Sequence, residues 1–303
     1  MKIAYQTANF RAATLDTIET VNQIIEEYQA QEFTLTLRQL YYQMVARDLI
    51  ENSKREYKKL SVVVSNGRLA GLIDWSAIED RTRYRRAVSH WEDGPDILDT
   101  VAEQFRVDKW ERQYYAPRVW IEKDALTGVI ADVCRRFDVP YMACIGYLSQ
   151  SAIWKDTQRM LQEHENVQVP IVIHLGDHDP SGIDMTRDIE ARLETFGVPE
   201  FRVERIALNY DQVQTYNPPP NFAKMTDSRI GGYLEQYGNR SWELDALEPS
   251  VIAQLVESKI AEYLDLTIWN EDVDRENDIR KILAQMAGNY DGIREFLNNG
   301  NGN

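Results

Sequence analysis

The chain has 303 residues, of which 43% are hydrophobic and 27% are charged, and it carries a net charge of −15. Its apolar runs are far shorter than a membrane span needs, and its acidity excludes a protein that coats nucleic acid indiscriminately. Cys134 and Cys144 are the only cysteines and show no CxxC spacing, so neither a disulfide scaffold nor a zinc site is expected. Both are expected to be small residues of the core. Residues 1–6 lack the apolar core of a signal peptide, and we expect a soluble cytoplasmic protein without a membrane partner.

Apolar spacing predicts three short helices at the start of the chain. The first has its apolar stripe between residues 18 and 28, the second spans about 37–50 and the third spans about 53–72. Consecutive valines at 62–64 leave a short strand as an alternative within the third helix. Three short helices with a basic third one resemble a helix-turn-helix or winged-helix module.

The positive charge of the chain is concentrated around these helices. Residues 33–91 hold eleven basic and six acidic residues, a net charge of +5, which leaves −20 for the remainder. A basic module on an acidic body is compatible with a local footprint on nucleic-acid phosphate, and a solvated basic face is the alternative. The candidate DNA-binding residues are Lys54, Arg55, Lys58, Lys59 and Arg68.

After residue 116 the pattern alternates between strands and helices. The predicted strands are 118–122, 139–145, 169–175 and 201–207, and the predicted helices between them are 124–137, 150–163 and 181–196. Crossovers of this length predict an α/β fold with a mainly parallel sheet and helices on both faces. The predicted organisation is an N-terminal helical, winged-helix-like domain (1–92), a linker with a helix at about 97–105 (93–116), an α/β domain (117–250) and a helical extension with a frayed tail (251–303).

Acidic side chains follow two of the predicted strands. Residues 170–182 (PIVIHLGDHDPSG) predict a buried strand that ends before Asp177 and Asp179, and Glu122 ends the first strand. Because ligands of open α/β sheets bind at the carboxyl ends of strands, we expect these carboxylates to converge there. Carboxylates without Cys or His ligands suit a hard cation, so the pattern predicts a Mg²⁺ site. An acidic turn is the alternative, and His178 is expected to point elsewhere.

The acidic strand ends resemble those of a known domain. A Glu at one strand end, here Glu122 followed by Lys123, and an Asp-x-Asp at another, here Asp177 and Asp179, resemble the Toprim domain of topoisomerases, bacterial primases and several nucleases. The fuller pattern DHDPSGIDM looks most like the A subunit of topoisomerase VI and its relative, the meiotic double-strand-break protein.

Two further stretches are similar to the same family. Residues 38–42 (RQLYY) resemble its Arg-Asp-Ile/Leu-Tyr-Tyr motif, and residues 242–248 (WELDALE) resemble a late acidic-Leu-acidic-Ala-Leu stretch. Gln39 departs from the pattern, because the family has an acidic residue at that position. The chain also lacks a Walker-type phosphate loop, so no ATPase of its own is expected.

The resemblance implies a CAP-like winged helix followed by a Rossmann-like Toprim domain, and DNA cleavage through a tyrosyl-phosphodiester intermediate. Tyr42 is then the nucleophile, and Mg²⁺ held by Glu122, Asp177 and Asp179 assists the leaving oxygen. A cation one helical turn before the tyrosine, Arg38, is placed to stabilise the phenolate or the phosphate. Lys123 is a candidate phosphate contact. The product is a 5′-phosphotyrosyl enzyme.

The family also implies partners. These are double-stranded DNA, a second copy of the chain and a separate ATPase subunit, at the nucleoid. In the implied homodimer, Tyr42 of one subunit meets the metal of the other, and two staggered cuts make a double-strand break. Two rivals stay open. A Toprim nuclease keeps the acidic residues and activates water, with Tyr42 in the core, whereas a non-catalytic DNA-binding protein shows salt-dependent binding without cleavage.

Overall fold

The computed structural model describes residues 1–31, 33–78, 88–223, 227 and 229–300. The chain divides into two compact units, one of residues 1–83 and 117–262 and one of residues 84–116 and 263–303, and each is described by itself. Within the described part of the chain, no helix has the length and apolar character needed to cross a membrane. Both cysteines are free and buried, as expected of core residues.

The N-terminal part of the first unit consists of three helices, namely α1 (Ala12–Gln29), α2 (Leu37–Ala46) and α3 (Lys54–Leu69). Apolar residues at helical spacing on α1 face inward and form a common core with α2 and α3. The hydroxyl of Thr36 accepts the backbone N–H of Gln39 and caps α2, and Ser53 caps α3 in the same way. Residues 62–64 are helical, so the alternative of a strand there is wrong.

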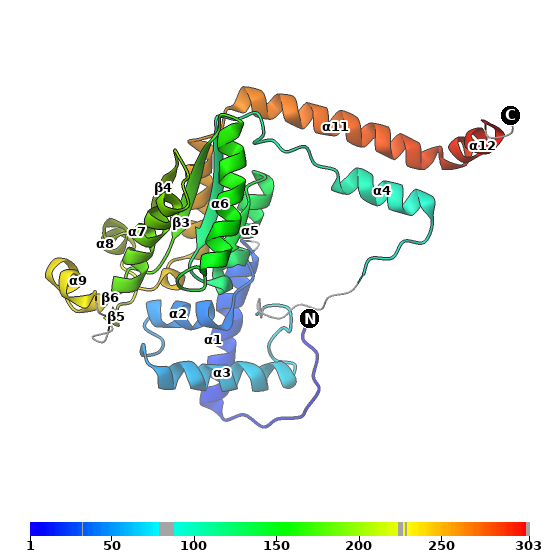
Figure 1. The fold of residues 1–303 in the computed structure, drawn as a ribbon. Coiled ribbons are helices and arrows are strands. Elements are labelled where there is room, and N and C mark those ends of the chain that lie inside the picture. The colour runs from blue at the N-terminus through cyan, green and yellow to red at the C-terminus, as the bar shows by residue number, and fades with distance from the viewer. Residues whose placement is uncertain (32, 79–87, 224–226, 228, 301–303) are drawn as a thin grey trace. The chain divides into compact units, whose positions relative to one another are not determined.

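The sheet of the first unit has four parallel strands in the order β2-β1-β3-β4 (Figure 1). They are β1 (Tyr115–Ile121), β2 (Tyr141–Ala143), β3 (Val169–Leu175) and β4 (Arg202–Ala207). The connecting segments are η1 (Asp124–Leu126), α5 (Thr127–Arg136), α6 (Gln150–Glu165) and α7 (Pro180–Thr195). The predicted α/β class with a mainly parallel sheet is confirmed, although β2 is shorter than predicted and a 3-10 turn precedes α5.

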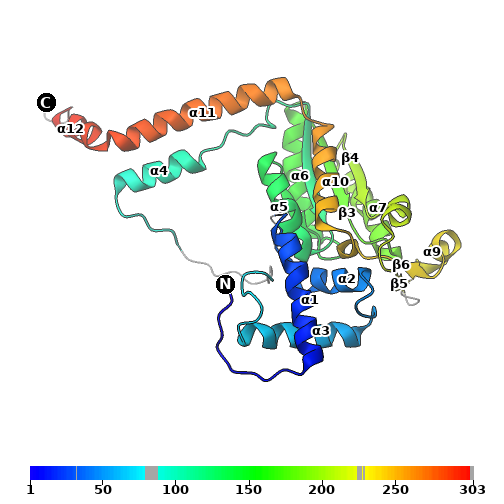
Figure 2. The same cartoon turned by 180° about the vertical axis from the view of Figure 1, so that it is seen from behind.

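Helices cover both faces of this sheet. Figures 1 and 2 show α6 and α7 on one face, and α5 and α10 (Pro249–Ala261) on the other. Every residue of β3 is buried as a result, which explains its nearly continuous apolar sequence. The sheet thereby holds the carboxyl ends of β1 and β3 side by side, and the backbone N–H of Glu122 donates to the carbonyl of Leu175 at 2.8 Å.

A second, small sheet is formed by residues that follow β4 and precede α10 in the sequence. The elements of this region are α8 (Tyr210–Tyr216), β5 (Asn221–Phe222), α9 (Ile230–Tyr237), β6 (Arg240–Ser241) and η2 (Leu244–Ala246). β5 and β6 pair antiparallel, with Asn221 opposite Ser241 and Phe222 opposite Arg240. Residues 218–220 are three prolines, whose fixed φ angles restrict the chain that leads into β5.

The second unit contains α4 (Gly94–Gln104), α11 (Leu266–Gly288) and α12 (Tyr290–Gly300). Segment 93–116, expected to be a linker, thus contains a helix that shares a compact unit with the C-terminal helices. Buried acids of α11 explain this pairing, because Lys109 contacts Glu276 at 2.5 Å and Arg112 contacts Asp272 at 3.1 Å. The basic residues at 81–86 and residues 301–303 of the predicted frayed tail lie outside the described residues.

A buried histidine in β3 makes the stability of the first unit dependent on pH. Burial lowers the pKa of His174 to about 3, from an ordinary value near 6.5. The folded state therefore needs the neutral ring, so its stabilisation is complete above pH 6.5 and is lost as the pH falls. We expect this residue to lower the unfolding free energy by roughly 2 kcal/mol at pH 5 relative to pH 7.5. His174→Leu should remove that part of the pH dependence.

Urea unfolding of wild type and variant at the two pH values measures the difference. His90→Leu makes the same substitution at an exposed position of the second unit and controls for a general effect of replacing histidine by leucine. An equal loss of stability at low pH in wild type and His174→Leu would contradict the assignment.

Candidate active site

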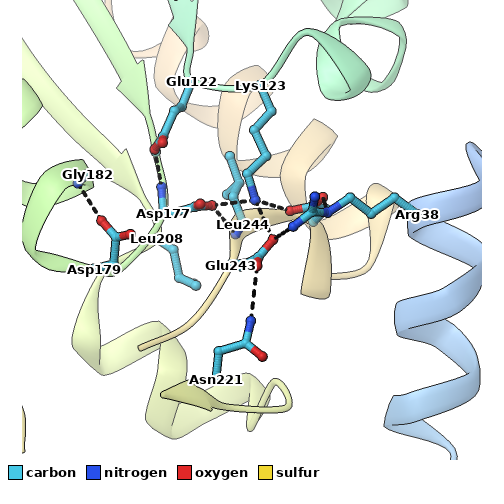
Figure 3. A network of polar contacts seen from close by, with 12 residues as sticks. Arg38, Glu122, Lys123, Asp177, Asp179, Gly182, Leu208, Asn221, Glu243 and Leu244 are labelled. Carbon is cyan, nitrogen blue, oxygen red and sulfur yellow. Dashed lines mark hydrogen bonds and ion pairs between the residues drawn. The ribbon is translucent and has the colours of Figure 1, made fainter. Parts of the chain in front are cut away.

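Carboxylate side chains close the turn after β3 by accepting its backbone N–H groups. Oε2 of Glu122 accepts the backbone N–H of Asp177 at 2.7 Å, and Oδ1 of Asp179 caps α7 by accepting the N–H of Gly182 at 2.7 Å (Figure 3). A Cβ on Gly182 would lie 2.2 Å from the carbonyl oxygen of Asp177, so only glycine fits there. The three predicted carboxylates therefore lie around one tight turn at the carboxyl edge of the sheet.

The carboxylate of Asp177 is the most deeply buried of the three. Its Oδ1 accepts the backbone N–H of Leu244 at 2.8 Å and lies 2.9 Å from Nζ of Lys123. Burial raises the pKa of Asp177 to about 7, with the nearby charge of Glu122 adding to the rise and Lys123 opposing it. Burial also raises the pKa of Glu122. The nearby charge of Asp179 adds to the rise for Glu122, whereas the hydrogen bond from the backbone of Asp177 opposes it.

Lys123 and Arg38 form a charge network with two acidic residues of the 242–248 stretch (Figure 3). Nζ of Lys123 lies 2.8 Å from Glu243 and also forms an ion pair with Asp245. Nε of Arg38 lies 2.8 Å from Asp245, and its Nη2 forms an ion pair with Glu243. Burial opposes the charge of Glu243, but the two cations outweigh it and lower its pKa to about 2. The network links α2 to the acidic turn.

Tyr42 lies next to this network. Its side chain is buried, Nδ2 of Asn221 donates to its hydroxyl at 3.4 Å, and the guanidinium carbon of Arg38 lies 5.8 Å from the centre of its ring. Burial raises the pKa of Tyr42, and the negative charge of Glu243 raises it further. In this conformation the phenol is therefore neutral at physiological pH, and its hydroxyl carries the proton.

A cavity of about 510 Å³ brings most of the predicted site together. It is lined by residues of α2, of the start of α3, of the acidic turn and of the β5–β6 hairpin with the residues after it. These are Arg38, Tyr41, Tyr42, Asn52, Ser53, Lys54, Tyr57, Asp177, Asp179, Asn221, Phe222, Ser241, Trp242 and Glu243. Glu122 and Lys123 do not line this cavity, but both contact residues that do. Glu122 accepts the N–H of Asp177, and Lys123 forms ion pairs with Asp177 and Glu243.

The candidate site has acidic oxygens of the kind that a hard cation prefers, but they do not form a metal site in this arrangement. Five acidic side chains (Glu122, Asp177, Asp179, Glu243 and Asp245) stand against three cations (Arg38, Lys123 and Arg205), an excess of two negative charges when all five are ionised. A dication offsets this excess, and oxygen ligands are those that magnesium prefers. No group of three Asp, Glu, His or Cys side chains among the described residues is arranged to hold a metal ion, and one oxygen each of Glu122 and Asp179 accepts a backbone N–H.

The predicted DNA-binding residues fall into two sets. The side chains of Lys54, Arg55, Lys58 and Lys59 line one depression on the surface of α3. Arg68 differs, because it donates a hydrogen bond to the carbonyl of Trp75 at 3.0 Å and its guanidinium carbon lies 5.7 Å from the centre of the Trp75 ring. The first set is available to phosphate, whereas Arg68 supports the fold of its own segment.

The side chain of His178 does not line the cavity with Asp177 and Asp179, in agreement with the expectation that it points elsewhere, and the residue has a structural role. Its backbone pairs with that of Trp242 through two hydrogen bonds of 2.8 and 3.0 Å, which hold the 242–248 stretch against the acidic turn. The ring is buried with Nδ1 2.9 Å from the hydroxyl of Tyr233, and burial lowers the pKa of His178 to about 4. The imidazole is therefore neutral at pH 7.

Four residues of the site have no role in the sequence-based prediction, namely Asn221, Arg205, Glu243 and Asp245. Arg205 is buried behind the acidic turn and donates to the carbonyl groups of Asp177 and Gly182 at 2.7 and 2.8 Å. The acids Glu243 and Asp245 belong to the stretch that carries the family resemblance, so that signal was available. Asn221 and Arg205 stand alone in their segments, and no local pattern marks them.

No family model matches this chain, and neither the curated proteins nor the solved structures contain a significant match to it. Its function is therefore inferred from its own residues and their arrangement.

Removing the ammonium of Lys123 should destabilise the protein in a pH-dependent way. Lys123→Met leaves Asp177, Glu243 and Asp245 without their shared cation, and breaking a buried pair typically costs roughly 3 kcal/mol. The loss should be largest at pH 7.5 and smaller at pH 5, because the unpaired carboxylates then take up protons in the folded state. Urea unfolding at both pH values measures it.

Lys59 provides the matched control. It forms an exposed ion pair with Glu56, so Lys59→Met should change the unfolding free energy by less than about 0.5 kcal/mol. Equal effects of the two substitutions would show that the network around Lys123 does not stabilise the fold.

Proposed function

We propose that this chain cleaves double-stranded DNA by transesterification, with Tyr42 as the nucleophile and with magnesium as cofactor, in the manner of a type IIB topoisomerase A subunit. The proposal includes a homodimer, a location at the nucleoid in the cytoplasm, and a separate ATPase subunit as a further candidate partner. The Toprim and winged-helix identities of the two parts of the first unit belong to the same proposal.

One observation carries it. A single cavity is lined by Tyr42 and Arg38 from α2 and by Asp177 and Asp179 from the acidic turn, although these pairs lie far apart in the sequence. A nucleophile, a cation and acidic oxygens beside each other are what phosphodiester cleavage requires. The family resemblance rests on separate motifs, and it does not by itself require the tyrosine and the aspartates to line one cavity of the same chain.

The chemistry divides among the side chains of the site. The phenol oxygen of Tyr42 attacks the phosphorus as its proton leaves, the bond from phosphorus to the 3′ oxygen breaks, and that oxygen takes up a proton. Arg38 is placed to neutralise the phosphate or the phenolate, since it already lies over the Tyr42 ring. When bound by Glu122, Asp177 and Asp179, magnesium supplies charge neutralisation at the phosphate. The product is a 5′-phosphotyrosyl enzyme and a free 3′ hydroxyl.

The burial of Tyr42 favours a second candidate, hydrolysis by a nuclease. The neutral phenol is a weak nucleophile, and burial together with Glu243 raises its pKa. A nuclease would use the acidic residues with a metal ion that activates a water molecule, and Tyr42 would be a core residue at the wall of the cavity. The two candidates differ in one product, because only transesterification leaves protein attached to the DNA ends.

Tyr42→Phe should abolish DNA cleavage, with a loss of at least roughly 1,000-fold, because it removes the attacking oxygen. The assay incubates supercoiled plasmid with the protein and magnesium, and resolves the products on a denaturing gel with and without protease digestion. Wild type should leave protein on the 5′ ends. Free ends produced equally by wild type and Tyr42→Phe would establish the nuclease.

Tyr41→Phe is the matched control, because it removes the same oxygen from a neighbouring residue whose hydroxyl donates to Asn52 at 2.9 Å. It should cleave within about threefold of wild type. Mixing Tyr42→Phe with Asp179→Asn tests which subunit completes the site. No recovery of cleavage fits the arrangement within one chain, whereas recovery supports the homodimer that the resemblance implies.

The basic depression on α3 should contribute to DNA affinity through counterion release. The double substitution Lys54→Gln and Lys58→Gln should weaken binding of every sequence alike. It should also make the negative slope of log K against log salt less steep by about 2. Fluorescence anisotropy with a labelled duplex at several salt concentrations measures the slope. An unchanged slope would assign these lysines to a solvated face.

A further inference from the structure

The β5–β6 hairpin carries an aromatic ring to the edge of the cavity. Phe222 is 84% exposed, the largest exposed fraction among the large hydrophobic side chains in the described part of the chain, and it lines the same cavity as Tyr42. Single exposed apolar side chains are common on protein surfaces and need no explanation by themselves. The position of this ring beside a candidate nucleophile is what distinguishes it.

The backbone under Phe222 is held from several sides. β5 pairs with β6, and the N–H of Ala223 donates to the carbonyl of Asn239 at 3.0 Å. The side chain of Asn221 accepts a hydrogen bond from Asn52 at 2.8 Å and donates to Glu243 at 3.0 Å (Figure 3). The ring therefore stands on a support that is tied to the turn before α3 and to the charge network.

Cations accompany the ring. Arg240 is exposed and lies opposite Phe222 in the strand register. Lys54 lines both the cavity and the basic depression on α3. An apolar aromatic face beside positive charge suits a nucleic acid, because the bases stack on the ring while the cations follow the phosphates.

We propose that Phe222 stacks on a nucleobase next to the phosphate that Tyr42 attacks. The inference rests on the proposed function and adds a substrate preference to it. A base reaches the ring only after it has left the stack of its neighbours, so the site favours DNA in which unstacking is easy. Gapped duplexes and flexible pyrimidine–purine steps are such substrates.

The test uses the full-length protein and a series of duplexes that carry one 2-aminopurine at successive positions, with and without a short single-stranded gap. EDTA prevents metal-dependent cleavage. This base becomes more fluorescent when it leaves the stack. We expect wild type to raise the fluorescence severalfold at one position, and Phe222→Ala to remove the rise and weaken binding to the gapped duplex about 10-fold. The slope of binding against salt should stay unchanged.

Two further variants separate stacking from a general effect. Phe222→Tyr keeps an aromatic face and should retain the fluorescence rise. Phe296→Ala removes an aromatic ring that is 75% exposed and does not line the cavity, and it should behave as wild type.

A fluorescence rise in Phe222→Ala equal to that of wild type would overturn the inference while cleavage by wild type continues. An altered salt slope in Phe222→Ala, with gapped and intact duplexes weakened equally, would overturn it as well. If wild type neither binds nor cleaves DNA, the proposed function fails together with this inference, and the cleavage assay identifies that case.

Discussion

The ammonium of Lys123 holds the candidate site together. It faces Asp177 in the acidic turn and Glu243 and Asp245 in a stretch about sixty residues later, and Arg38 of α2 shares the latter two acids. Burial alone would lower the pKa of this lysine, but the three carboxylates outweigh burial and raise it. Because its partners come from separate segments, the network fixes α2 against the edge of the sheet.

This constraint also determines the state of Tyr42. Arg38 is bound to Glu243 and Asp245, and the same acids keep the phenol protonated. In the proposed function, a phosphate that enters the cavity competes with these carboxylates for Arg38 and Lys123. On this proposal, the anionic substrate replaces an internal carboxylate as the partner of these cations.

The distribution of charge over the molecule is consistent with such a substrate. The chain is strongly acidic, but four cations line one depression on α3, and Lys54 among them also lines the cavity. A polyanion is therefore repelled by the net charge of the chain and attracted at this depression, which gives orientation as well as affinity. Phe222 adds an apolar face to the same cavity, on a hairpin that no charge pattern marks.

The sequence by itself determined the elements of the fold and the chemistry at the strand ends. Hydrophobic periodicity and capping residues act within a few positions, so β3, α7, the cap at Thr36 and the acidic residues at 177 and 179 follow from local patterns. Only the tertiary structure decided which charges pair. Lys123 and Arg38 have many acidic candidates along the chain, and the packing of distant elements selects Asp177, Glu243 and Asp245. The same packing placed Asn221 on the hydroxyl of Tyr42 and paired α4 with α11, because such contacts depend on neighbours in space that no short stretch of sequence specifies.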